Sequence, residues 1–300
     1  MCNSIVAGVD IGGSHITVAL IDMEKGEVLK HTWKRSEVNA QSSASTIIDN
    51  WSKAIEESVA AHNSLPCRLG IAMPGPFNYE EGISLMQNQN KFDALYGLNV
   101  KQLLLDNLQV QIEQITMTND AACYLKGEVY SGAAKGCNRA LGITLGTGLG
   151  SARSINRVVE DANLWCSPFK EGIAEDYLSS RWFVNRYAEL TGIVVKDVKT
   201  LVDKTATNPI AQQIVDEFGQ NLGTFLLPYV VNDAVETVVL GGNIANAYPL
   251  FSQALKKVLL ENGCTVEIKQ TLLGENAILV GAASYCLKHE EVELLSIDIK

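Results

Sequence analysis

The sequence predicts an α/β protein made of two related halves, each with a mixed β-sheet. Strand patterns and helix patterns are interspersed along the 300 residues, and the chain opens with three consecutive strand-like segments. A unit in which glycines separate two apolar runs occurs at the start and again about 130 residues later. This repetition indicates that one architecture is used twice.

Apolar and β-branched runs predict the strands, and apolar residues spaced three or four apart predict the helices. In the first half the expected strands are residues 5–9, 15–21, 28–33, 67–73 and 111–117. The expected helices there are residues 45–62, 100–108 and 121–131, with a loop-rich stretch over residues 77–97.

In the second half, strands are expected on both sides of the glycines at 146–150 and at residues 237–240 and 265–270. The expected helices are residues 172–190, 208–231, 248–262 and 277–288. We expect a smaller N-terminal lobe over residues 1–118, completed by the C-terminal segment 277–300, and a larger lobe over residues 119–276. Trp165 and Trp182 are expected to be packing residues.

Composition excludes several classes of protein. With 47% hydrophobic and 19% charged residues, the chain has the composition of a globular protein. A formal net charge of −10 argues against a non-specific nucleic-acid or anionic-membrane binder, which would normally present a basic face. No apolar run approaches the ~20 residues of a membrane span, and the N-terminus lacks the pattern of a signal peptide.

The cysteines and histidines indicate the cellular compartment of the protein and whether it has a structural zinc site. The seven cysteines are scattered and never stand in a CxxC spacing, which favours a reduced, cytoplasmic protein. The four histidines do not cluster with the cysteines, so no structural zinc site is expected.

The first glycine turn joins two strands and carries a carboxylate. Gly12 and Gly13 lack a Cβ, which lets backbone N–H groups approach an oxyanion closely, and Ser14 follows them. Asp10, at the end of the first strand, could hold a divalent cation through oxygen ligands. The segment is therefore either a phosphate-binding clip or a hairpin whose glycines serve only turn geometry.

The second glycine turn contains Gly146, Thr147 and Gly148. A dinucleotide fingerprint would need a helix directly after the glycines, but residues 151–159 are β-like. No GxxxxGK[ST] run exists, which excludes a P-loop. A second phosphate clip, with the Thr147 hydroxyl contributing, and a plain hairpin turn both remain open.

Asn119 and Asp120 follow a predicted strand and begin a predicted helix. Both residue types favour the N-cap, so a capping role is expected. A carboxylate at a helix N-terminus is also kept ionised by the helix dipole, which suits a proton acceptor.

Three further segments are candidates for ligand contact. Gly241, Gly242 and Asn243 end a strand ahead of a helix, which admits either a flat ligand or a tight turn. Gly75 lies in a rigid Pro-Gly-Pro turn, and Asn90 lies in a polar loop that could bind hydroxyl groups.

Five motifs described above, taken in their order along the chain, resemble those of the ROK family of sugar kinases, within the actin/hexokinase-like superfamily. The resemblance covers essentially the whole chain, and residues 277–283 are similar to the family's closing helix. The motifs are residues 9–14, 74–76 followed by Asn90, 118–122, 145–150 and 240–243.

The chain departs from the family pattern after the second glycine turn. Family members typically carry a Gly-Glu-Ile-Gly-His segment and a cysteine-rich zinc motif there, whereas this region has no histidine and only Cys166. Asn163 stands in the place of the family's glutamate. Gly172 to Glu175 matches the end of the zinc motif, where a glutamate contacts the sugar.

The resemblance implies a two-lobed, ribonuclease H-like α/β fold with a mixed sheet and flanking helices in each lobe. It implies a glucokinase-like activity, ATP-dependent phosphorylation of a hexose or hexosamine hydroxyl, with Asp120 as catalytic base, Mg²⁺ held by Asp10 directly or through water, and a homodimer. The implied ATP and phosphate contacts are Asp10, Gly12, Gly13, Ser14, Gly146, Thr147, Gly148, Gly241, Gly242 and Asn243. The implied sugar contacts are Gly75, Asn90, Asn119, Asp120, Glu175 and Asn163.

A second hypothesis is a non-catalytic sugar-binding sensor, because some relatives of this family are transcriptional repressors. Those carry an N-terminal helix-turn-helix domain, whereas here the phosphate motif begins within ten residues of Met1. The acidic charge also disfavours DNA binding. The presence of Asp10, Asp120 and both glycine turns favours the enzyme.

Overall fold

A computed structural model describes residues 4–62, 66, 68–89, 91–110, 112 and 114–287 of the chain. It divides into two compact units, the first formed by residues 1–132 and 275–300 and the second by residues 133–274. The chain therefore divides after Gly132 rather than after residue 118, and the helix that begins at Asp120 belongs to the first unit.

The first unit contains a mixed sheet with the strand order β3-β2-β1-β5-β8, and β4 also pairs with β2. Strands β1, β5 and β8 run parallel to one another, and the other pairings are antiparallel. The strands are β1 Ile5–Ile11, β2 His15–Asp22, β3 Glu27–Val28, β4 Lys34–Glu37, β5 Arg68–Met73 and β8 Gln114–Asn119. A separate short hairpin, β6 Phe77–Asn78 and β7 Ile83–Ser84, follows β5. The expected strand at 28–33 is wrong beyond Val28, because Lys30–Thr32 forms the 3₁₀ helix η1.

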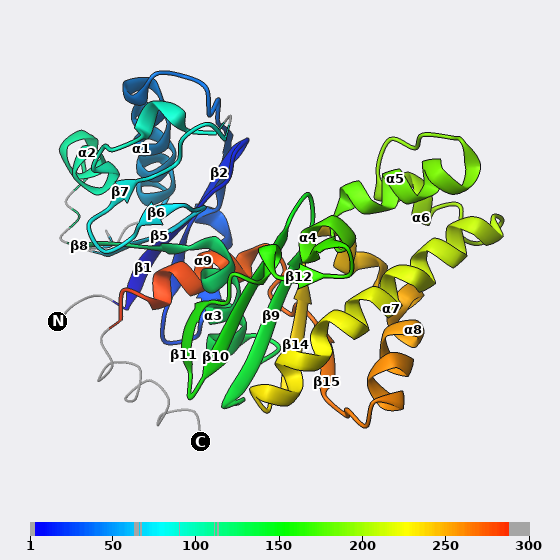
Figure 1. Ribbon diagram of the computed structural model, residues 1–300. Coiled ribbons are helices and arrows are strands. Elements are labelled where there is room, and N and C mark those ends of the chain that lie inside the picture. The colour runs from blue at the N-terminus through cyan, green and yellow to red at the C-terminus, as the bar shows by residue number, and fades with distance from the viewer. Residues whose placement is uncertain are drawn as a thin grey trace. The chain divides into compact units, whose positions relative to one another are not determined.

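Helices cover both faces of this sheet (Figure 1). The odd-numbered residues of β1 pack with α1, where Trp51 lies fully buried against Phe92 with ring centroids 5.2 Å apart. Gly8 of β1 faces the other side and lies against the backbone of α9. The helices of this unit are α1 Ala44–Ala60, α2 Val100–Asn107, α3 Asp120–Ser131, α9 Asn276–Ser284 and the 3₁₀ turn η2 Asp93–Leu95.

Helices α3 and α9 approach each other at glycines. A Cβ on Gly127 of α3 would overlap the carbonyl of Ala277, and a Cβ on Gly281 of α9 would overlap the carbonyl of Cys123. Side chains at these two positions would separate the helices, so the glycines allow α9 to pack directly on α3 and on the sheet. This contact explains why α3 belongs to the first unit.

The second unit repeats the topology of the first. Its sheet has the order β11-β10-β9-β14-β15, with β9 and β10 antiparallel and β9, β14 and β15 parallel. The strands are β9 Arg139–Leu145, β10 Leu149–Ile155, β11 Val158–Asp161, β14 Thr237–Gly241 and β15 Glu267–Gln270. The predicted duplication is confirmed, because β9 stands in the same place in its sheet as β1 does in the first.

The helices of the second unit enclose an aromatic core. Phe218 lies at its centre, with the ring of Phe183 4.6 Å away and that of Phe251 5.2 Å away between centroids. The helices are α4 Ala174–Tyr177, α5 Ser180–Thr191, α6 Val198–Val202, α7 Pro209–Asn232 and α8 Tyr248–Glu261. Trp182 packs into this core as expected, whereas Trp165 is 43% exposed, which corrects the expectation for that residue.

The helix expected over residues 172–190 is interrupted. Its first residues form the hairpin of β12 Pro168–Phe169 and β13 Gly172–Ile173, and Ser179 is extended between α4 and α5. This break places the Ser180 backbone N–H and hydroxyl on the carbonyl of Gly146, at 2.8 and 2.7 Å. Where the helix is interrupted, Ser180 thus makes two hydrogen bonds to the glycine turn.

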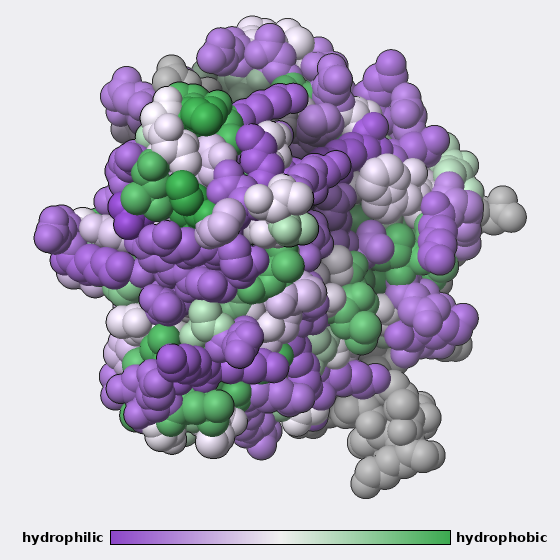
Figure 2. Space-filling model, turned by 90° about the vertical axis from the view of Figure 1, so that its right-hand side faces the viewer, coloured by the Kyte–Doolittle hydropathy of each residue, from purple (hydrophilic) through white to green (hydrophobic). Residues whose placement is uncertain are grey.

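The surface in Figure 2 is mostly hydrophilic, with separate hydrophobic patches. Throughout the part of the chain that the structure describes, no helix has the length and apolar character that crossing a membrane requires.

Candidate functional site

The first unit gathers candidate residues at one edge of its sheet. Asp10 pairs in register with Ala72 of β5, and Met73 of β5 pairs with Asn119 of β8. Because β1, β5 and β8 are parallel, their carboxyl ends share an edge, which is where ligands bind in open α/β sheets. Gly75 follows β5 and Asp120 follows β8 at this edge. The structure thus brings together the residues that the sequence placed in three separate motifs.

The first glycine turn is held by the backbone. The Gly12 N–H donates to the His15 carbonyl at 2.8 Å, and the Ser14 carbonyl accepts from the N–H of Val38 at 2.8 Å. The Ser14 hydroxyl lies 2.9 Å from Nδ1 of His15. Gly13 and Ser14 are exposed, so the turn presents its backbone to solvent beside Asp10.

Asn119 caps helix α3, as the sequence predicts. Its Oδ1 accepts from the N–H groups of Ala121 and Ala122 at 2.8 and 3.2 Å. Its Nδ2 donates to the hydroxyl of Tyr79 at 3.4 Å. The Asn119 side chain is therefore held in one position by hydrogen bonds at both ends. Its Oδ1 already accepts from the N–H groups that it caps.

The Asp120 carboxylate lies at the start of α3. Its Oδ1 accepts from the N–H of Ala121 at 2.9 Å, and the side chain is half-buried. Gly75 stands opposite Tyr79, since a Cβ on this glycine would lie 3.3 Å from the tyrosine hydroxyl. The turn at Gly75 is thus held close to the residue that anchors Asn119.

Electrostatics single out Asp10. Burial raises its pKa from 3.8 to about 7, and the negative charges of Asp120 and Glu275 contribute to this rise in pKa. The positive charges of Arg35 and Lys91 act in the opposite direction. A carboxyl group so raised in pKa, and influenced by a second carboxylate, marks a place where a cation would be stabilised.

Sequence reasoning missed Lys91. A Cβ built on Gly13 would lie 3.2 Å from Cε of this lysine, so the side chain passes along the glycine turn. Burial lowers the pKa of Lys91, while the charges of Asp120 and Asp10 oppose that shift. No motif marks a lysine at this point of a polar loop. Asn90, the preceding residue and a predicted sugar contact, lies outside the described residues.

The second glycine turn is fixed within the second unit. The N–H of Gly146 donates to the carbonyl of Gly148 at 3.0 Å, and Thr147 between them is exposed. A side chain on Gly146 would meet no atom within 4 Å, so open space adjoins this turn within the unit.

Glu175 is attached to the second turn. Its Oε2 accepts from the N–H of Leu149 at 3.1 Å and lies close enough to Gly148 to crowd any side chain there. Its Oε1 lies 3.5 Å from Arg181. Glu175 therefore holds the turn in place by a hydrogen bond. The hairpin of two-residue strands before α4 positions Glu175 for this contact.

Asn163 and the third glycine segment occupy special backbone conformations. Asn163 is left-handed (φ 50°) and its Oδ1 accepts from Nε1 of Trp165 at 2.7 Å. Gly242 has φ +81°, and a Cβ there would overlap the carbonyl of Leu145 at the end of β9. Asn243 begins the 3₁₀ helix η4 Asn243–Ala247 and is exposed. Only glycine fits at position 242.

The site residues fit a magnesium ion at Asp10. Burial and, after it, the negative charge of Asp120 disfavour the charged form of this carboxyl group, and a divalent cation would offset both effects. The described residues contain no group of three or more His, Cys, Asp or Glu side chains that could hold a metal ion.

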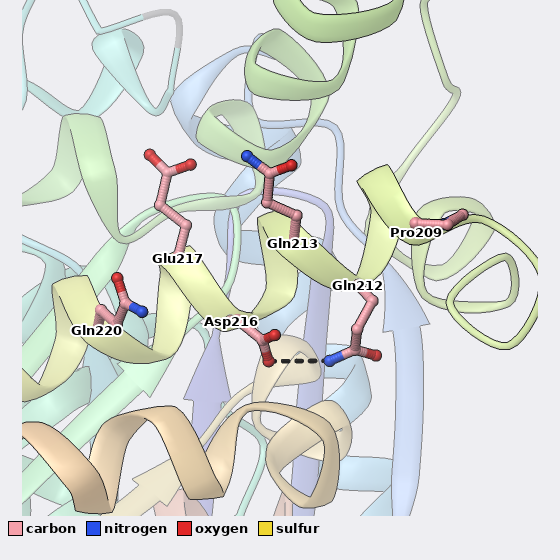
Figure 3. Close-up of a pocket in the computed structure, with 6 residues that line it drawn as sticks. All are labelled: Pro209, Gln212, Gln213, Asp216, Glu217 and Gln220. Carbon is pink, nitrogen blue, oxygen red and sulfur yellow. Dashed lines mark hydrogen bonds between the residues drawn. The ribbon is translucent and has the colours of Figure 1, made fainter.

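A hollow of about 570 Å³ lies along one face of α7 in the second unit (Figure 3). Its polar side chains include several that already have partners. Gln212 donates to Asp216 at 2.9 Å, as Figure 3 shows, and Glu217 accepts from Arg186 at 3.0 Å. Among the described residues, no predicted site residue lines this hollow, so it contributes nothing to the candidate site.

Comparison with known proteins gives a consistent result. The ROK family model matches residues 6–289. The chain is 25% identical over 305 residues to N-acetylgalactosamine kinase AgaK from Shewanella sp. (strain ANA-3), covering 92% of this chain and 94% of the relative. It is 25% identical over 284 residues to N-acetyl-D-glucosamine kinase from Photobacterium profundum, covering 84% of this chain and 88% of that relative.

A solved structure has the same fold. The ROK family glucokinase from Streptomyces griseus, in complex with glucose and AMPPNP, superposes with a TM-score of 0.76 at 22% identity. The match covers 94% of this chain and 99% of that one. The predicted fold class is therefore confirmed.

Proposed function

The chain belongs to the ROK family, and we propose that it is an ATP-dependent carbohydrate kinase that phosphorylates a hydroxyl of a hexose or hexosamine. The observation that carries this proposal is the placement of Asp10 and Asp120 at one sheet edge beside a glycine turn. One carboxylate can serve a phosphate-bound cation while the other serves the acceptor hydroxyl. A protein that only binds sugar has no need of both.

Asp120 is the proposed general base. As the acceptor oxygen forms a bond to the γ-phosphorus, the bond from that phosphorus to the β-phosphate oxygen breaks and ADP leaves. The hydroxyl proton passes to the Asp120 carboxylate, which lies in the first turn of α3. The Ala121 N–H holds the carboxylate in one orientation, so the base is already positioned when the substrate arrives.

Backbone N–H groups are the proposed phosphate ligands. We assign the turn of Gly12, Gly13 and Ser14 to this task in the first unit. The N–H groups of Gly13 and Ser14 are the proposed donors, because that of Gly12 already donates to the His15 carbonyl and fixes the turn. Asp10 is the residue that would hold Mg²⁺, directly or through water. When bound, that ion supplies positive charge to the phosphate oxygens, where phosphoryl-transfer enzymes obtain much of their catalysis.

In the second unit, Gly146, Thr147 and Gly148 are proposed to contact phosphate, and the strand end at Gly241, Gly242 and Asn243 to contact the adenosine part of ATP. The support is local. The turn at Gly146 has open space beside it, and the Gly242 backbone lies against β9 where only glycine fits. These assignments follow the order of the motifs and the conformations of the turns.

The proposed acceptor is glucose or an N-acetylated hexosamine. Glucose is the sugar named in the Streptomyces griseus structure, and N-acetylhexosamines are named in the two relatives above. Proposed sugar contacts are Gly75, Asn90, Asn119, Asp120, Glu175 and Asn163. Because Asn119 and Glu175 already hold backbone N–H groups, each can offer a sugar only its remaining polar atoms.

The proposal is tested by ADP release across a panel of hexoses and hexosamines with Mg²⁺-ATP. We expect sugar-dependent ADP release from at least one member, and a loss of about 10²- to 10⁴-fold in kcat in Asp120→Asn. That variant keeps an oxygen that can accept from Ala121, so α3 stays capped. Asp49→Asn, an exposed change on α1, is the matched control. Sugar binding without ADP release would instead indicate the sensor function.

A further inference from the structure

We infer that Lys91 contacts the γ-phosphate of the nucleotide, so that its ammonium group distinguishes a nucleoside triphosphate from a diphosphate. This inference rests on the proposed kinase function and adds a substrate-contacting residue that no motif of the sequence indicated. It concerns the first unit alone, in which Lys91, Gly13, Asp10 and Asp120 all lie.

Geometry places the Lys91 side chain on the glycine turn. Measured from the position that a Cβ of Gly13 would take, Cε lies at 3.2 Å, Cδ at 3.5 Å and Cγ at 3.7 Å. Three consecutive carbons of the Lys91 side chain therefore pass close to Gly13, on the side where other residues carry a Cβ. The ammonium group is one bond beyond Cε, the carbon that lies nearest to the turn whose backbone N–H groups are the proposed phosphate ligands.

Among the described residues, the charge of Lys91 has no partner at contact distance. Within the part of the chain that the structure describes, Lys91 has neither a hydrogen bond nor an ion pair, although its side chain is half-buried. Arg35, another cation that acts on Asp10, is paired with Glu275 at 2.9 Å. Partial burial of an unpaired ammonium is unfavourable unless an anion binds it.

Asp10 and Asp120 attract this ammonium from a distance, and the proposed function already gives both carboxylates other tasks. A phosphate group between the turn and Lys91 would provide the missing anion, because a lysine serves phosphate as a compact, mobile point charge. The rival explanation is that Lys91 merely balances the two carboxylates. In that case removal of the Lys91 charge would change the binding affinities for the triphosphate and the diphosphate equally.

The test compares the affinities of AMPPNP and ADP by isothermal titration calorimetry, at pH 8 and saturating Mg²⁺. We expect Lys91→Met to weaken AMPPNP binding by about 10- to 100-fold, the range for loss of one charge-assisted contact, and to change ADP binding by less than about threefold. Lys91→Arg should retain most of the AMPPNP affinity. Lys53→Met, which removes an exposed lysine from α1, should change neither affinity.

Two results would overturn the inference: an equal loss for both nucleotides in Lys91→Met, or no loss for either. Thermal unfolding of each variant shows whether it is folded, and Lys91→Gln, which also removes the charge, replaces the methionine variant if that one is not. The proposed function fails separately, if the unmodified protein shows no sugar-dependent ADP release. Turnover that depends on Asp120, with an unchanged AMPPNP-to-ADP ratio in Lys91→Met, would overturn only the role of Lys91.

Discussion

Replacing Asp10 by Asn should stabilise the ligand-free protein more at pH 8 than at pH 5. The pKa of Asp10 is about 7 in the folded protein and 3.8 for an unperturbed aspartate, so the folded state holds the proton more tightly than the unfolded chain. Between these two values the wild-type protein loses stability as pH rises, because the folded state still holds a proton that the unfolded chain has already released. An asparagine does not titrate and escapes this loss.

The magnitude follows from the pH interval. About two pH units separate pH 5 from the folded-state pKa, and each unit corresponds to about 1.4 kcal/mol, so the upper limit is about 3 kcal/mol. Asp10 is only partly shielded from solvent, which reduces the effect, and we expect about 1–3 kcal/mol. Above pH 7 the difference between the two proteins should become constant.

The assay is urea unfolding of wild-type and Asp10→Asn protein at pH 5 and pH 8 in the presence of EDTA. Other titrating groups are common to both proteins and cancel in the comparison. Asp49→Asn makes the same change of charge at an exposed position and should show a difference that is independent of pH. A stability difference for Asp10→Asn that stays constant between pH 5 and pH 8 would refute the reasoning about this carboxyl group.

Two further predictions concern the cation and the packing of the first unit. At pH 8, millimolar Mg²⁺ should raise the thermal midpoint of wild-type protein but not of Asp10→Asn, and equal shifts in differential scanning calorimetry would remove Asp10 as the ligand. Gly281→Ala should lower the free energy of unfolding by roughly 2 kcal/mol or more, because its Cβ would overlap the Cys123 carbonyl. Gly97→Ala, which meets no neighbour and carries only the strain of φ +73°, should cost about 1 kcal/mol; equal losses in urea titrations would contradict the packing explanation.

Sequence patterns predict much of the fold because strands and glycine turns are local features. The repeated turn at Gly12 and Gly146 predicts two sheets of one topology, and the structure has them. The strands around the first turn begin and end close to their predicted limits, and strands flank the second turn as expected. Apolar periodicity likewise locates the long helix that begins at Pro209.

The errors arise where contacts distant in sequence override local preference. Residues 172–190 look helical, but Ser180 bonds to Gly146 and interrupts the helix. Trp165 looks like a core residue, but its indole N–H bonds to Asn163 on an exposed turn. A boundary at residue 118 assigns helix α3 to the second half, whereas the approach of Gly127 to α9, about 150 positions away, holds it in the first.

Within the candidate site, motif residues can be predicted and their electrostatic partners cannot. Asp10 and Asp120 stand in recognisable patterns, so the sequence identifies them. Lys91 stands in no pattern, and only the folded chain shows that it passes along Gly13. The raised pKa of Asp10 likewise depends on burial and on neighbours from four separate segments.

The central claim is that the Asp120 carboxylate accepts a proton from a sugar hydroxyl during phosphate transfer from ATP. Its most direct test is sugar-dependent ADP release by wild-type protein and by Asp120→Asn, with glucose, N-acetylglucosamine and N-acetylgalactosamine as acceptors. We expect release with at least one of these sugars in the wild-type protein and a decrease in kcat of about 10²- to 10⁴-fold in the variant, with ATP affinity retained. Near-normal turnover in Asp120→Asn would contradict the claim.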